Sequence, residues 1–236
     1  HDALTLPAAG FSNRRRRSLL KPRTWRRQRF LDRPERYYAY FADRLKRRGI
    51  LLTGDITPSY SGLSAGTLDN IRRGFEAYAI PVRPVFLMRD PIERIISSAR
   101  MQRRKQGLFD SAGEVAALRE LCRQRPERID LRGDYGHTLK SLDAAFGLSH
   151  CFVDLYEQLF TPTCWIRLCR VLNIPYEEPQ WEQKLNVSRT DTALPEDVLA
   201  ELGQWQAPAL AAVRQNCPQL DLDRFWPTTV RWCPPQ

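Results

Sequence analysis

The sequence has no hydrophobic run long enough to cross a lipid bilayer. Its apolar stretches all fall short of the roughly 18 consecutive residues that a membrane-spanning helix needs. It also has no basic start followed by an apolar core and a cleavage site, so no signal peptide is recognised. We therefore expect a cytoplasmic protein without a membrane span.

Cysteine and histidine are too scattered to predict a metal centre or a disulfide framework. The six cysteines include no CxxC pair, which in a chain of this length favours buried thiols in a reducing compartment. A pair between Cys217 and Cys233 stays open. The three histidines, His1, His137 and His150, lie far apart, and each is more typical of a surface or core position than of a metal ligand. No metal cofactor is expected.

Basic residues are concentrated in the first fifth of the chain. Residues 1–50 hold 15 Lys and Arg but only four acidic residues, and the whole 236-residue chain has a formal charge of +10. The rest of the chain is therefore close to neutral. A local excess of positive charge indicates either an anionic partner or a solvated face, and both interpretations stay open.

Short apolar runs alternate with segments of helical periodicity. We expect strands at 50–55 ("ILLTGD"), 85–88 ("VFLM") and 151–156 ("CFVDLY"), helices at 34–48, 67–79, from 91 onward and at 162–174, and irregular structure at 12–30. Strands separated by helices require crossover connections, so the pattern predicts an α/β fold with a mainly parallel sheet. We expect a single domain over 1–236, with a basic segment at 12–48 and a helical tail at about 195–236.

The stretch "VFLMRDPIERIISSARMQRR" at 85–104 is the most informative. It ends a strand at Arg89 and opens a helix with Asp90 as the N-cap, Pro91 in the first turn and Glu93 completing a capping box. At about 100° per residue, Ser97 lies two turns above Asp90 on the same side of the helix. A guanidinium and a hydroxyl beside a positive helix terminus, at the carboxyl edge of a sheet, suit an anion. The alternative, that Arg89 pairs with surface acids, stays open.

This stretch resembles the 3′-phosphate-binding motif of sulfotransferases that use 3′-phosphoadenosine 5′-phosphosulfate (PAPS) and release 3′-phosphoadenosine 5′-phosphate (PAP). The family pattern is an arginine that ends a strand, a proline two positions on, a second arginine, and a serine eight positions after the first arginine. The resemblance implies that Arg89 and Ser97 bind the 3′-phosphate of the cofactor. The resemblance also implies that Arg94 is a structural residue that forms an ion pair.

Other segments extend the resemblance over most of the chain, in the family's order. "LLTGDITPSY" at 51–60 is similar to the segment Gly-Glu-Lys-(Ser/Thr)-Pro-x-Tyr, whose glutamate is the catalytic base in heparan-type and many bacterial members. "CFVDLYEQLFTPTCWIRLCRVLNI" at 151–174 resembles the family's strand, Tyr-Glu-x-Leu and following helix, and "KLNVSRT" at 184–190 resembles its Asn-x-Ser loop. The implied fold is a P-loop-NTPase-like three-layer α/β fold, with a mainly parallel central sheet flanked by helices.

Two departures from the family pattern bear on the chemistry. Asp55 and Ile56 stand where Glu-Lys is usual, so Asp55 is the expected base with a reach shorter by one methylene group; the alternative is that it caps a loop or pairs with an arginine. The Gly-rich phosphosulfate loop with its lysine should precede "HDALTLP" at 1–7, and "SGLSAGT" at 61–67 has no lysine to replace it. We expect either a native protein that is longer at its N-terminus or a non-catalytic relative.

The implied function is transfer of a sulfuryl group from PAPS to a hydroxyl or amine, an in-line displacement that depends on positioning and electrostatics. Asp55 would take the acceptor's proton, and Ser188 and Arg189 would close over the nucleotide. Tyr135 is a candidate either to line the site or to pack in the core. The acceptor is expected to be a small molecule, a glycan or a lipid-like compound, and the basic segment suggests an anionic one.

The competing class is a nucleic-acid-binding or polyanion-binding protein that uses the basic and aromatic N-terminal segment.

Overall fold

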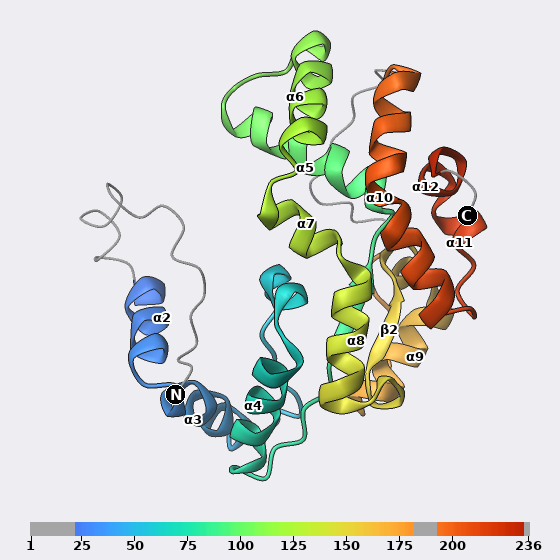
Figure 1. The fold of residues 1–236 in the computed structure, drawn as a ribbon. Helices are drawn as coiled ribbons and strands as arrows, with labels where there is room; N and C mark the ends of the chain where they lie inside the picture. The colour runs from blue at the N-terminus through green and yellow to red at the C-terminus, as the bar shows by residue number, and fades with distance from the viewer. Residues whose placement is uncertain (1–21, 182–192, 234–236) are drawn as a thin grey trace. The chain divides into compact units, whose positions relative to one another are not determined.

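A computed structural model describes residues 22–181 and 193–233 of the chain (Figure 1). These residues fall into two compact units, and each unit is described by itself. The single domain expected over 1–236 stays a prediction. The first unit holds the described residues up to Ile56 together with Ala65–Val82, and the second holds Thr57–Ser64 and the described residues from Arg83 onward. Within the described ranges, no helix is both long enough and apolar enough to cross a membrane.

Helices and an aromatic core make up the described part of the first unit. The helices are α2 (Pro22–Asp32), α3 (Glu35–Leu45) and α4 (Ala65–Glu76). The helices expected at 34–48 and 67–79 are therefore confirmed with shifted ends, whereas α2 occupies part of the segment expected to be irregular. The core rings meet edge to face at centroid distances of 4.9–5.8 Å, and they include Tyr37, Tyr38, Phe41 and Phe75. Edge-to-face pairs of this kind stabilise a core beyond the area that they bury.

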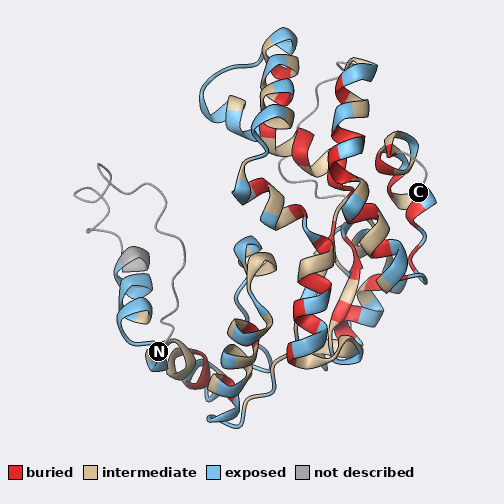
Figure 2. Cartoon of the chain, viewed as in Figure 1, coloured by how far each residue is buried: buried red, intermediate tan, exposed pale blue. Residues whose placement is uncertain are grey.

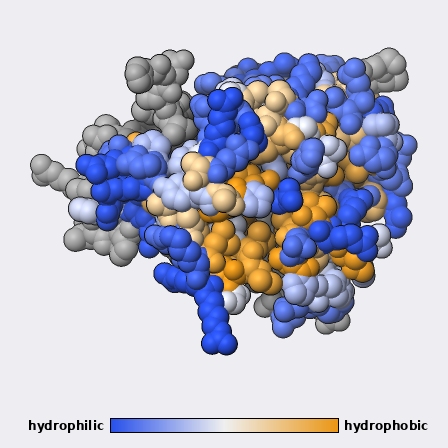
Figure 3. Space-filling view, turned by 90° about the horizontal axis from the view of Figure 1, so that it is seen from below, coloured by the Kyte–Doolittle hydropathy of each residue, from blue (hydrophilic) through white to orange (hydrophobic). Residues whose placement is uncertain are grey.

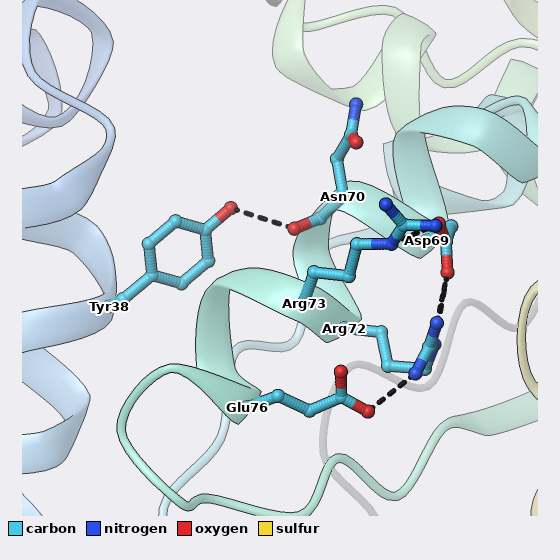
Figure 4. A network of polar contacts seen from close by, with 6 residues as sticks. All are labelled: Tyr38, Asp69, Asn70, Arg72, Arg73 and Glu76. Carbon is cyan, nitrogen blue, oxygen red and sulfur yellow. Dashed lines mark hydrogen bonds and ion pairs between the residues drawn. The ribbon is translucent and has the colours of Figure 1, made fainter.

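Ion pairs between its own side chains stabilise α4 (Figure 4). Arg72 bonds both Asp69 and Glu76, and Arg73 Nε lies 2.8 Å from Asp69 Oδ2. Because the Arg72 guanidinium donates to it, the pKa of Asp69 is below its ordinary value. These pairs are spaced i,i+3 and i,i+4, the spacing at which helix side chains meet.

The ring of Tyr38 leaves no room for a side chain at Gly74. A Cβ at this glycine would lie 2.1 Å from Tyr38 Cζ. The Tyr38 hydroxyl donates to the Asn70 carbonyl at 3.4 Å, and burial raises the pKa of Tyr38 (Figure 4). Gly74 is therefore fixed by the close approach of α3 to α4.

A two-stranded parallel sheet lies within the second unit. Strand β1 (Val85–Met88) pairs with β2 (Phe152–Leu155) in register, Val85 opposite Phe152 and Met88 opposite Leu155. The strands expected at 85–88 and 151–156 are confirmed. The α-helices of this unit are α5 (Pro91–Lys105), α6 (Ser111–Gln124), α7 (Glu127–Gly133), α8 (Tyr135–Phe146), α9 (Pro162–Leu172), α10 (Glu196–Asn216), α11 (Leu222–Phe225) and α12 (Pro227–Trp232). Short 3-10 turns add η1 (Pro58–Gly62), η2 (Leu148–His150) and η3 (Tyr156–Phe160).

Helix α10 organises the core of the second unit. It packs against α5, α6, α8 and α12, and buried residues line these contacts in Figure 2. One cluster joins β1 and β2 to α8 and α10 and includes Met88, Leu139, Leu155 and Trp226, each fully buried. All six cysteines are free thiols, and four of them are buried, including Cys217 and Cys233, which form no disulfide. Helices α10, α11 and α12 lie in the segment from about 195 where we expected a helical tail.

The strand expected at 50–55 is wrong. Residues 50–56 have no regular structure, and their apolar side chains are exposed, with Leu51 at 70% and Ile56 at 98% exposure. A strand needs a neighbour for its backbone groups, and in the described ranges β1 pairs only with β2. Figure 3 shows one face of the molecule, on which hydrophobic residues gather near the middle and hydrophilic residues lie around them. The described chain is thus mostly helical with a small parallel sheet, so the α/β character is present but limited, and the three-layer P-loop-like fold stays a prediction.

Candidate functional site

The candidate site begins where β1 ends, and its backbone is held by Tyr135. The Tyr135 hydroxyl donates to the Arg89 carbonyl at 2.7 Å and accepts from the Arg89 N–H at 3.3 Å. Its side chain is 2% exposed and packs against Phe86 and Trp226. Burial raises the pKa of Tyr135 to about 12, so the hydroxyl keeps its proton and can donate. Tyr135 therefore packs in the core and fixes the strand end, rather than facing a ligand.

Asp90 caps α5, as the sequence predicts. Its buried carboxylate accepts from the amides of Ile92 at 3.0 Å and Glu93 at 3.1 Å, and Oδ1 also accepts from the Thr229 hydroxyl at 2.5 Å. The second hydrogen bond of the expected capping box, from the Asp90 N–H to the Glu93 side chain, does not form. The Asp90 N–H donates to Glu157 Oε1 at 3.1 Å, and Glu93 instead accepts from Thr228. The helix start is thus closed by residues from the tail and from η3.

This cap changes the expected anion site. An anion at a helix N-terminus needs free N–H groups, but Asp90 already occupies two of them with a buried negative charge. A phosphate bound at this junction must therefore be held by side chains. The N–H groups at the start of α5 contribute less to its binding than we expected.

Glu157 is a structural residue of the junction that sequence reasoning did not single out. Besides the Asp90 N–H, it accepts from the indole of Trp226 at 3.2 Å. Burial raises the pKa of Glu157, because water no longer solvates its charged form fully. The available signal was the Tyr-Glu-x-Leu likeness at 156–159, and the structure shows what its glutamate holds.

The Arg89 side chain has no internal anionic partner. Its guanidinium lies 5.9 Å from the centroid of the half-exposed Tyr156 ring, and it makes no ion pair or side-chain hydrogen bond with any residue that the structure describes. The alternative of pairing with Asp90 or Glu93 is therefore not what the structure shows. Ser97, which lies on α5 two turns beyond Asp90, is partly buried. Its hydroxyl makes no hydrogen bond within the described ranges. Both groups are available to a ligand.

Arg94 is partly buried and lacks the expected ion pair. It donates to the Ile129 carbonyl at 3.3 Å, and no carboxylate of the described chain lies within ion-pair distance of it. Burial lowers the pKa of Arg94, while the nearby Tyr135 hydroxyl opposes that effect. Arg94 is thus structural, but through burial and a carbonyl contact rather than through a salt bridge.

The segment "GDITPSY" is divided between the two units. Asp55 belongs to the first unit, is exposed, and accepts a hydrogen bond from the Tyr37 hydroxyl at 3.1 Å. The following segment, Thr57–Ser64, belongs to the second unit, where Ser59 accepts from Arg132 and the Ser61 carbonyl accepts from Thr138 at 2.8 Å. Ser188 and Arg189 lie outside the described residues.

Comparison with known proteins adds no assignment. No family model matches the chain, and neither a curated protein nor a solved structure matches it significantly. Within the described ranges, no group of three or more His, Cys, Asp or Glu side chains is placed to hold a metal ion. Any functional conclusion therefore depends on the residues of the site itself.

Proposed function

We propose that the protein is a sulfotransferase that moves a sulfuryl group from PAPS to a hydroxyl or amine of an acceptor and releases PAP. The observation that carries the proposal is the Arg89 guanidinium, which extends from the end of β1 without an anionic partner among the described residues. An arginine kept available in this way is suited to bidentate binding of a phosphate group.

The residues present fit the 3′-phosphate of such a donor. Arg89 would supply two charge-assisted hydrogen bonds, and the Ser97 hydroxyl, two turns along α5, would supply a third. The aromatic face of Tyr156 restrains the guanidinium without neutralising it. Tyr135 and Glu157 fix the two peptide groups on either side of Arg89. The position of the Arg89 backbone therefore does not depend on the ligand.

Asp55 is the group that would accept a proton. When bound, PAPS supplies an activated sulfuryl group, whose bond to the bridging phosphate oxygen breaks as a new bond to the acceptor forms. The Asp55 carboxylate would take the proton from the acceptor hydroxyl or amine. The Tyr37 hydroxyl donates to this carboxylate at 3.1 Å and so orients it. The exposed Ile56 supplies no charge, so electrostatic stabilisation must come from other groups.

A comparison of two nucleotides tests the proposal directly. PAP and 5′-AMP differ by the 3′-phosphate alone, so calorimetry should find that PAP binds at least about tenfold more tightly, the value of one good charged hydrogen bond. Equal affinities, or no binding of PAP, would contradict the proposal. Binding of PAP without any sulfuryl transfer from PAPS would indicate the non-catalytic relative instead.

A further inference from the structure

The first unit carries a charged groove that the proposed donor site does not use. The groove lies between α2 and α3, has a volume of about 630 Å³, and is lined by Trp25, Arg26, Arg29, Phe30, Arg36, Ala39, Tyr40 and Asp43. It therefore combines three guanidinium groups, three aromatic rings and one carboxylate on two helices.

The floor of the groove is fixed before any ligand binds. The Arg26 guanidinium lies 5.0 Å from the centre of the Tyr40 ring and donates to the Tyr40 hydroxyl at 3.0 Å. Arg44 lies 4.8 Å from the same ring, and Phe30 packs against it at 5.5 Å. A guanidinium held by a ring and a neutral hydroxyl keeps its charge and its remaining donors, which lowers the entropic cost of binding an anion.

The positive charge of the groove is not balanced from within. Arg26, Arg29 and Arg36 make no ion pair with any carboxylate in the described part of the chain. Asp43, the one acidic residue of the lining, pairs with Lys46 at 3.0 Å instead. Residues 1–21 hold Arg14–Arg17 and Lys21 against the single acid Asp2, so their charge has the wrong sign to neutralise the groove. An anionic ligand from outside the chain is the complementary occupant.

The aromatic side chains indicate that this ligand also has an apolar face. The Trp25 ring is 59% exposed and makes no ring contact with the described residues. On a helix at about 100° per residue, Trp25, Phe30 and Leu31 point about 0°, 140° and 240° around the axis of α2, so they form no common apolar stripe. A lipid surface needs such a stripe, and the concave groove instead suits a chain or ring that lies between two helices.

We infer that the α2–α3 groove binds an acidic oligosaccharide, a chain of sugar rings that carries carboxylate or sulfate groups. The guanidiniums would bind the acidic groups, and the Trp25 ring, with its negative face, would stack on the C–H face of a sugar. A nucleic acid would present its phosphodiester groups to the same guanidiniums, and the DNA probe below distinguishes it from the sugar. This inference is independent of the proposed donor site, whose Arg89 and Ser97 belong to the second unit.

A binding series on the whole 236-residue chain tests the inference. The probes are an oligogalacturonate of defined length, a maltooligosaccharide of the same length as the uncharged control, and single-stranded DNA with the same number of negative charges. At low salt the acidic sugar should bind, the uncharged sugar should bind at least about tenfold more weakly, and the DNA should bind more weakly than the acidic sugar. A sulfated oligosaccharide in the same series identifies which acidic group is preferred.

Matched variants locate the binding site. Trp25→Ala, and the pair Arg29→Gln with Arg36→Gln, should each weaken oligogalacturonate binding by about tenfold or more. Their controls are Phe109→Ala, which removes another exposed aromatic ring, and Arg47→Gln with Arg48→Gln, which removes the same charge outside the groove. Equal losses in variants and controls would overturn the inference, as would equal binding of the uncharged sugar. Tighter binding of DNA that is lost with the same groove variants would overturn it in favour of a nucleic-acid site. All these residues are exposed or half-buried, and a thermal unfolding curve for each variant checks the fold.

Discussion

The Tyr135 hydroxyl is bonded to both backbone polar groups of Arg89, at 2.7 Å to the carbonyl and 3.3 Å from the N–H. Glu157 takes the next N–H along the chain, that of Asp90. Two side chains from distant segments therefore hold the two peptides at which β1 becomes α5. None of these hydrogen bonds involves the Arg89 side chain. The backbone is therefore held in place, while the guanidinium has no hydrogen bond or ion pair within the described chain.

Replacing Tyr135 with Phe should destabilise the fold and weaken nucleotide binding together. The change leaves a buried carbonyl and a buried N–H without their partner, which costs about 1–3 kcal/mol in the free energy of unfolding. PAP affinity should fall as well, because the peptide that carries Arg89 is no longer fixed. Chemical denaturation and calorimetry measure the two effects. Tyr156→Phe is the control for stability, since its hydroxyl makes no hydrogen bond in the described chain; an equally small effect in both variants would contradict the role of the Tyr135 hydroxyl.

The raised pKa of Glu157 predicts how stability depends on pH. Burial raises this pKa above its ordinary 4.5, so the folded protein holds the proton more tightly than the unfolded chain does. The contribution of Glu157 to stability is therefore largest below about pH 4.5 and is lost as the pH rises through the raised pKa. In Glu157→Gln this titration is absent, so the difference in unfolding free energy between wild type and variant should shrink with rising pH. Denaturation curves from pH 4 to 8 measure it, with the exposed Glu201→Gln as control. A difference that stays constant or grows with pH would refute the assignment.

Gly74→Ala should destabilise the first unit, although alanine normally favours a helix. The added Cβ would lie 2.1 Å from Tyr38 Cζ, and the ring or the helix must move to make room. Overpacking of this kind costs about 1–3 kcal/mol, more than the ~1 kcal/mol that alanine gains in helix propensity. Gly66→Ala in the same helix meets no atom within 4 Å and should be neutral or stabilising. If both variants change the unfolding free energy alike, the contact between Tyr38 and Gly74 does not limit this position.

Local signals in the sequence predicted the elements around the site. Asp90 and Pro91 marked the start of α5, because these residues act on backbone groups within one turn. The apolar runs of β1 and β2 were identified because each is short, bounded and followed by a helix signal.

Contacts between distant residues account for what the sequence did not predict. Glu93 is well placed for a capping box, but Glu157, 67 positions away from Asp90, takes the N–H instead. The run at 50–55 has strand composition, yet a strand depends on a neighbour that no local pattern reveals. The groove between α2 and α3 was visible only as an excess of charge, since its concave shape arises when the two helices pack together.

Asp55→Asn should abolish sulfuryl transfer while leaving PAP affinity unchanged. An amide is nearly the same size and can accept the hydrogen bond from Tyr37, but it cannot take a proton from an acceptor. Loss of a general base typically lowers a rate by about 10²–10⁴-fold. A transfer assay with PAPS measures the rate, and calorimetry with PAP checks binding. Asp32→Asn, a change at another exposed aspartate of the same unit, is the control. Retained turnover in Asp55→Asn would remove this residue as the base.

Arg89→Ala tests the group on which the proposed donor site depends. The change should weaken PAP binding by about 1.5–3 kcal/mol, the range for a hydrogen bond to a charged group, which corresponds to a loss in affinity of roughly ten- to 150-fold. Affinity for 5′-AMP should change little, because the arginine is assigned to the 3′-phosphate. The fold should also be little affected, since the guanidinium has no partner in the described chain and only its backbone is clamped. Lys105→Ala, at the exposed end of the same helix, removes one positive charge away from the junction and controls for general electrostatics. If PAP affinity is the same in Arg89→Ala and Lys105→Ala, the end of β1 does not bind the 3′-phosphate, and the functional assignment fails with it.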